Sequence, residues 1–199
     1  MFTASALLPP VGKCRRYERK ALQIRQFAGV KLDEPLDPYL LAKHARLRVV
    51  SLDELCGLSP EAKSQLLKCD PDGWSGGASE PLPDGSRLVI LNPMHGRERQ
   101  AATLMEEVCH VFLGHHLNRL GLPVHGVSEA SRDYHQIEEE EAYAVGAAVL
   151  VPYYVLREAV EMHLPIEALA RRYGVSRRLV EYRLRVSGLC LARVLAEIS

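Results

Sequence analysis

The sequence lacks three features that would each assign a class of protein. It has no excess charge, because 25 Lys and Arg balance 25 Asp and Glu, which argues against a whole-protein binder of nucleic acid or of a membrane surface. It has no apolar run approaching the length of a transmembrane helix, so we expect no membrane partner. At the N-terminus the basic residues follow the short apolar stretch, whereas a secretory signal has them first.

Closely spaced cysteines are missing as well. The 5 cysteines are odd in number and widely spaced, and no two of them form a C-x-x-C motif. This pattern argues against a disulfide framework and favours a reducing environment. We therefore expect a cytoplasmic protein.

Apolar residues at helical spacing are abundant. They predict helices over residues 17–30, 97–119 and 137–150. Asp37 followed by Pro38 is typical of a helix start, with the aspartate as the N-cap and the proline in the first turn.

Two short aliphatic runs predict strands. They are LRVVSL at 47–52 and SRLVILN at 86–92, and we expect the second at a sheet edge, where an extended peptide can pair with it. Between them lies a stretch of 17 residues, 70–86, of which 13 are Asp, Pro, Gly or Ser, and this composition predicts a long loop. The fold class predicted is α+β, with a small, mostly antiparallel sheet packed on helices.

The C-terminal residues have the rhythm of a helix-turn-helix. In PIEALARRYGVSRRLVEYRL, Ala170 allows close helix packing, Gly174 makes the turn, and Ser176 caps the second helix. Arg177 and Arg178, which open that helix, are candidates for contact with nucleic-acid phosphates. The alternative, which we favour, is a structural or partner-docking role.

The stretch EEVCHVFLGHH, which begins at Glu106, carries a candidate metal site. Glu106 and His110 lie four residues apart, so a helix places both on one face, where they can bind one ion together. Glu107 takes the position that the general base has in H-E-x-x-H peptidases. Glu and His at this spacing also form ordinary helix-surface pairs, so the motif alone is a weak signal.

A catalytic zinc site usually has three protein ligands and one water, so a third ligand is needed. His116 is one candidate, but Gly114 stands one residue later than the glycine that turns the chain in H-E-x-x-H-x-x-G-x-x-H. The other candidate is Glu141, which leads an apolar stripe on the following helix. We expect Glu141, whereas the preceding glutamates are expected to form a solvated helix end.

Several motifs in order resemble the ImmA/IrrE metallopeptidase family over about residues 20–190. They are LDPYLLAKHARLRVV, RLVILNP, RQAATLMEEVCHVFLGHH and EAYAVGAAVLVP. The resemblance implies a zincin-like helical core in residues 1–160, followed by a small helical module in residues 161–199. It also implies that Glu107 is the base and that His110 and Glu141 are metal ligands. Known members cleave helix-turn-helix repressors, so a repressor is the implied protein substrate, within a stress or mobile-element response.

The sequence departs from the family pattern at Glu106, which replaces a histidine ligand, and at Tyr143, which replaces an asparagine. Two carboxylates and one imidazole bring a ligand charge of about −2, which weakens Lewis acidity and favours harder ions. We expect one divalent metal, Zn or Mn. Two interpretations stay open: a peptidase with altered chemistry, or a weakened pseudopeptidase that regulates by binding protein or DNA. Tyr143 and His135 are candidates for contact with the substrate or the transition state.

Overall fold

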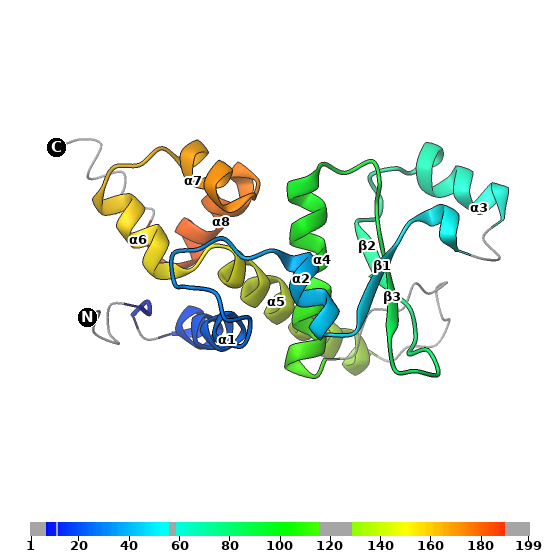
Figure 1. Ribbon diagram of the computed structural model, residues 1–199, viewed down its shortest axis with the longest axis horizontal. Helices are drawn as coiled ribbons and strands as arrows, with labels where there is room; N and C mark the ends of the chain where they lie inside the picture. Colours follow the sequence, from blue (N-terminus) through cyan, green and yellow to red (C-terminus); the bar gives the residue numbers. More distant parts are fainter. Residues whose placement is uncertain (1–6, 11, 56–58, 116–128, 190–199) are drawn as a thin grey trace. The chain divides into compact units, whose positions relative to one another are not determined.

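The computed structural model describes residues 7–10, 12–55, 59–115 and 129–189, and of residues 129–135 it describes the backbone alone (Figure 1). The chain forms two compact units. The first, Asp37–Ala142, is called the sheet unit here, and the second, Met1–Leu36 with Tyr143–Ser199, the helical unit. The boundary predicted near residue 160 falls inside the helical unit.

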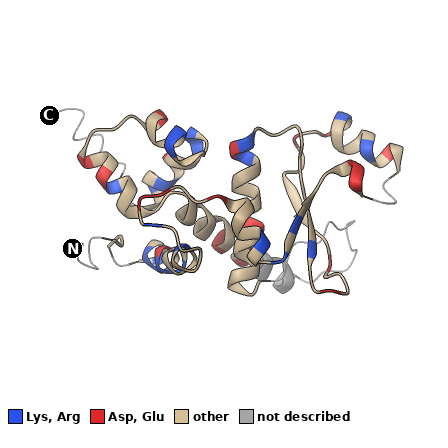
Figure 2. Cartoon of the chain, viewed as in Figure 1, with Lys and Arg blue, Asp and Glu red and all other residues tan. Residues whose placement is uncertain are grey.

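The two units carry opposite charge. The sheet unit has 17 Asp and Glu against 10 Lys and Arg, whereas the helical unit has 8 against 15. Figure 2 colours the charged residues of the described part of the chain. The zero net charge of the whole chain therefore conceals one acidic and one basic half. An acidic unit attracts cations, and a basic unit attracts anionic partners.

The sheet unit contains one small mixed sheet and the helices beside it. Its elements are α2 (Pro38–His44), β1 (Leu47–Val50), η1 (Leu52–Glu54), α3 (Pro60–Ser64), η2 (Gln65–Cys69), β2 (Gly76–Ala78), β3 (Arg87–Leu91), α4 (Arg97–Leu113) and the first part of α5 (Glu129–Leu150). Asp37 caps α2 as predicted, because its side chain accepts a hydrogen bond from the Tyr39 N–H at 2.9 Å. The α+β class is confirmed.

The sheet differs from the expectation in two respects. The strand order is β1-β3-β2, with β1 parallel and β2 antiparallel to β3, so the described sheet is mixed rather than mostly antiparallel. The expectation that β3 is an edge strand is wrong, because β3 has a neighbour on each side. Val89, Ile90 and Leu91 are buried, as a central strand requires.

Strand β2 lies inside the stretch that the composition predicts to be a loop. Its Gly-Gly-Ala sequence has no strand propensity, and backbone pairing with β3 alone defines it. Gly76 is required there, since a Cβ at this position would lie 2.7 Å from Thr103 Cγ2 of α4. The buried Asn92 fixes the start of the stretch, because its Nδ2 donates to the Pro71 and Trp74 carbonyls at 2.6 and 2.8 Å.

Helix α4 ends earlier than the predicted residue 119. Gly114 adopts the left-handed conformation (φ 72°) directly after Leu113 and stops the helix. Residues 116–119 lie outside the described part of the chain. The helix passes beside α2 and the sheet, and its buried positions include Leu104, Met105 and Val108.

The helical unit contains α1 (Lys13–Phe27), the end of α5, α6 (Tyr153–Glu161), α7 (Ile166–Tyr173) and α8 (Arg177–Val186). Gly174 (φ 61°) ends α7, and the Ser176 side chain caps α8 by accepting from the Leu179 N–H, so the predicted turn residues act as expected. Helix α1 belongs here because its buried Glu18 pairs with Arg183 of α8.

Among the described helices, none is by itself long and apolar enough to cross a bilayer. Gln136–Leu150 and Tyr153–Glu161 meet the length and composition requirement only as a pair bent by 53°.

Candidate metal centre

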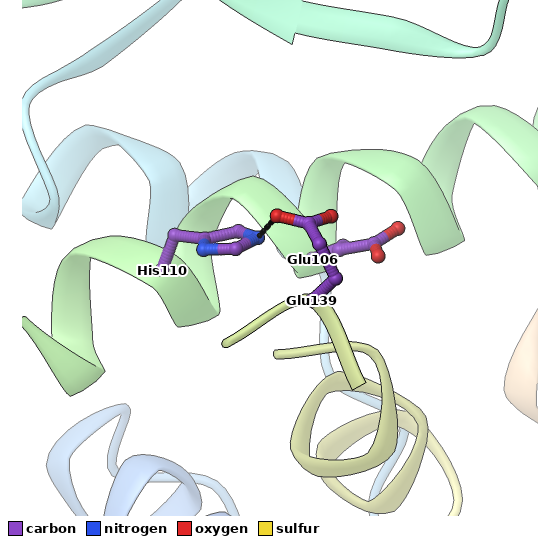
Figure 3. Close-up of side chains that lie close together, drawn as sticks. All are labelled: Glu106, His110 and Glu139. Atoms are coloured by element: carbon purple, nitrogen blue, oxygen red, sulfur yellow. Dashed lines mark ion pairs between the residues drawn. The ribbon is translucent and has the colours of Figure 1, made fainter. Parts of the chain in front are cut away.

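Three side chains of the sheet unit converge on one point. Glu106 and His110 come from one face of α4, and Glu139 comes from α5 (Figure 3). One ligand atom from each lies within 4.8 Å of the other two, and His110 Nε2 is 3.3 Å from a Glu139 carboxylate oxygen. Among the described residues, these three side chains form the one group of at least three His, Cys, Asp or Glu residues that could hold a metal ion.

Burial changes the protonation of these side chains. Burial, followed by the negative charge of Glu139, raises the pKa of Glu106 to about 7. Burial also raises the pKa of Glu107 to about 7, with Glu139 adding to the effect and His110 opposing it. For His110, burial lowers the pKa, but Glu139, Glu107 and Glu106 together outweigh this and raise it above the ordinary value. The group therefore holds protons near neutral pH unless another cation replaces them.

Two buried polar atoms beside the group have no hydrogen-bond partner among the described residues. They are Glu107 Oε2 and His110 Nδ1. Such atoms are costly to bury unpaired, so their persistence points to a site rather than to packing. Two carboxylates and an imidazole are a donor set that zinc and manganese accept. The residues present therefore fit a divalent metal.

The structure places the two candidate α5 glutamates differently. Glu139 lies in the group with Glu106 and His110, whereas Glu141 Oε2 lies 3.2 Å from His115 Nε2. Glu139 is not evident from the sequence, because it belongs to a run of four glutamates, 138–141, that resembles a solvated helix end. Glu139 and Glu141 are two residues apart, so their side chains lie on different faces of the helix. This spacing is the sequence feature that distinguishes the two glutamates.

The remaining predicted residues lie elsewhere. The side chain of His135 and all of His116 fall outside the described part of the chain. Tyr143 belongs to the helical unit, where its ring meets that of Tyr182 edge-on at 5.0 Å.

The two arginines that open α8 are both exposed. Arg177 forms ion pairs with Glu167 at 2.8 Å and with Glu181 at 2.7 Å. A phosphate contact by Arg177 would therefore compete with two carboxylates.

Comparison with known proteins identifies a family and related solved structures. The peptidase family model described as IrrE N-terminal-like domain matches residues 66–185. No curated protein matches. A solved structure described as Mycobacterium tuberculosis transcriptional regulator aligns with a TM-score of 0.53 and 18% identity, over 85% of this chain and 46% of that chain. At this identity the likeness shows the fold alone, and this chain spans less than half of that protein's length.

Proposed function

The chain belongs to the peptidase family of IrrE N-terminal-like domains, and we propose that it is a metal-dependent peptidase whose ion is held by Glu106, His110 and Glu139. The observation that carries the proposal is the convergence of these three side chains beside the unpartnered, buried oxygen of Glu107. Glu139 replaces Glu141 in the ligand set because it is the α5 carboxylate within reach of the other two.

Glu107 is the general base in this proposal. A divalent ion held by the three ligands supplies Lewis acidity for a scissile carbonyl and for the attacking water. Glu107 Oε2, which has no hydrogen-bond partner among the described residues, is the atom that accepts the proton of that water and returns it to the leaving amine. The pKa of about 7 is that of the metal-free protein, and a bound cation would lower it toward the ionised form that a base requires.

The ligand charge sets the expected metal. Glu106 and Glu139 with neutral His110 bring about −2, which lowers the acidity of a bound water relative to sites with more imidazoles. We propose Zn²⁺ or Mn²⁺, with Mn²⁺ favoured by the two carboxylates.

Metal analysis tests the site. Protein purified without added metal should contain a divalent ion, and Glu107→Gln should retain it because this residue is not a ligand. Glu106→His, which restores the more common ligand, should also retain metal and favour Zn²⁺ over Mn²⁺. Absence of metal from all three proteins would refute the metallopeptidase.

The substrate that we propose is a protein, and the resemblance of the motifs supports a helix-turn-helix repressor. Mapping of new protein N-termini in cells that express wild type or Glu107→Gln tests this. Termini that appear only with wild type should fall in a transcriptional repressor. Identical sets of termini would favour the alternative, a weakened pseudopeptidase that acts by binding.

DNA contact through α7 and α8 is a second, less favoured proposal. The basic composition of the helical unit supports it, and the two ion pairs of Arg177 weigh against it. A gel-shift assay with Arg177→Ala and Arg178→Ala tests it. Binding that is lost in Arg178→Ala but kept in Arg177→Ala is the result that fits these contacts.

A further inference from the structure

The hydrogen bonds at the C-terminal end of α4 fix the position of His115, which follows the helix. The Gly114 N–H donates to the Val111 carbonyl at 3.2 Å, and the His115 N–H donates to the His110 carbonyl at 2.9 Å. These two bonds, with Gly114 in the left-handed conformation, form a Schellman motif. The motif reverses the direction of the chain. Its second hydrogen bond holds the backbone of His115 next to the backbone of His110, which is a candidate metal ligand.

The side chains of these two residues also meet. The ring centroids of His110 and His115 are 5.3 Å apart, and the ring planes are inclined by 71°, which is an edge-to-face contact. Such a contact restricts how far either ring can rotate about its χ2 angle. The orientation of the His110 ring decides whether its Nε2 faces Glu139 and Glu106.

The His115 ring is in turn fixed by Glu141. His115 Nε2 lies 3.2 Å from Glu141 Oε2, and the two side chains are only 8% and 12% exposed. A buried carboxylate that binds one nitrogen of an imidazole sets both the tautomer and the rotation of the ring. The contacts thus run from Glu141 through His115 to His110.

We propose that His115 and Glu141 are a positioning pair that holds the His110 imidazole in the orientation that binds the metal. The inference rests on the proposed metal site, and it gives Glu141 a role other than that of a ligand. Neither residue belongs to the group of three whose ligand atoms lie within 4.8 Å of one another. Their effect on the ion therefore passes through His110.

Co²⁺ binding, followed by its visible absorption spectrum, tests the pair without any assay of activity. His115→Ala should weaken Co²⁺ binding about 10–100-fold and alter the spectrum, as loss of a residue that orients a ligand does. His115→Phe keeps an aromatic edge against His110 and should recover most of the affinity. Glu141→Gln, which keeps an acceptor for His115, should lie between wild type and His115→Ala.

Two glycines provide a matched control. Gly114 and Gly174 both end helices with positive φ, at 72° and 61°, and a Cβ at either would meet no atom within 4 Å. Alanine at either position should therefore destabilise the fold to a similar extent by backbone strain. Only Gly114→Ala, which disturbs the turn before His115, should also weaken Co²⁺ binding.

Three results would overturn the inference. Wild-type affinity and spectrum in His115→Ala would show that His110 needs no support. Equal weakness of His115→Phe and His115→Ala, together with wild-type affinity in Glu141→Gln, would show that a ring nitrogen of His115 touches the ion itself. If the wild-type protein binds no Co²⁺, both the proposed function and this inference are wrong. This result is distinguishable from the first two, because in those the wild-type protein binds Co²⁺.

Discussion

Each unit of the protein contains a cluster of charged side chains, and the two clusters differ in how far they are neutralised. In the helical unit, Glu18 is 0% exposed and forms an ion pair with Arg183, which is 2% exposed. The second carboxylate oxygen of Glu18 accepts from the Tyr153 N–H at 3.2 Å, and Arg183 Nε donates to the Val151 carbonyl at 3.0 Å. Both charges therefore have partners.

The cluster in the sheet unit is not neutralised in this way. Glu106, Glu107 and Glu139 face one imidazole, that of His110, and burial together with the charge of Glu139 raises the pKa values of the two α4 glutamates. Glu107 Oε2 and His110 Nδ1 have no hydrogen-bond partner among the described residues.

This difference indicates a structural role for the cluster in the helical unit and a functional role for the cluster in the sheet unit. A paired buried cluster fixes the packing of helices, whereas an under-neutralised cluster lowers stability and is kept for its chemistry. A divalent cation would supply the missing positive charge in the sheet unit. Substitutions in the two clusters should therefore have opposite consequences.

The largest effect is expected at the paired cluster. Glu18→Gln leaves the Arg183 charge buried without a counter-charge, so the free energy of unfolding should fall by about 3–5 kcal/mol. Urea denaturation of the metal-free protein measures this. Glu139→Gln is the matched change in the other cluster and should not lower stability, because it removes one carboxylate from an excess. Equal losses in both variants would contradict the comparison.

Metal should stabilise the wild-type protein next most strongly. At a free Zn²⁺ or Mn²⁺ concentration of about 100 times the dissociation constant, the gain is about 2.7 kcal/mol. Thermal unfolding with added metal or with a chelator measures the gain. Glu139→Gln should show no such gain, whereas Glu18→Gln should show the wild-type increment at a lower melting temperature.

The stability of the metal-free protein should depend on pH. Because the pKa values of Glu106 and Glu107 are raised from 4.5 to about 7, the folded state binds more protons than the unfolded state between these values. The free energy of unfolding should therefore fall by roughly 2–3 kcal/mol for each of these two carboxyls as the pH rises from about 4.5 to 7. Denaturation at a series of pH values tests this. A rise in stability over the same window, once metal is removed, would contradict the assignment.

Glu107→Gln should stabilise the metal-free protein while abolishing activity. At pH 8 this change replaces a buried negative charge with a neutral amide, so the free energy of unfolding should rise by up to about 3 kcal/mol. Peptidase activity should be lost while bound metal is kept, because the residue acts as a base and not as a ligand. Metal analysis beside the unfolding curve separates these effects, and loss of metal would make Glu107 a ligand instead.

Local patterns in the sequence were sufficient for the starts of α2 and α8 and for two of the three residues of the metal-binding group. The caps at Asp37 and Ser176 depend on neighbouring residues alone, and so does the shared face of Glu106 and His110. Family membership was likewise readable from ordered motifs.

Features that depend on contacts between residues far apart in the sequence could not be predicted from local patterns. Strand β2 exists because β3 offers hydrogen bonds to a Gly-Gly-Ala segment that has no strand propensity. Which of Glu139 and Glu141 lies with Glu106 and His110 depends on how α5 is rotated about its axis against α4. The apolar periodicity of α5 does not define this rotation closely enough within a run of glutamates. The mixed sheet and the central place of β3 likewise follow from long-range register.

Calorimetric titration of Zn²⁺ into metal-free wild type, Glu139→Gln and Glu141→Gln tests whether Glu139 is the third metal ligand. We expect about one equivalent of Zn²⁺ to bind to wild type, none to Glu139→Gln, and about one, more weakly, to Glu141→Gln. Full binding by Glu139→Gln with none by Glu141→Gln would contradict this expectation and make Glu141 the third ligand.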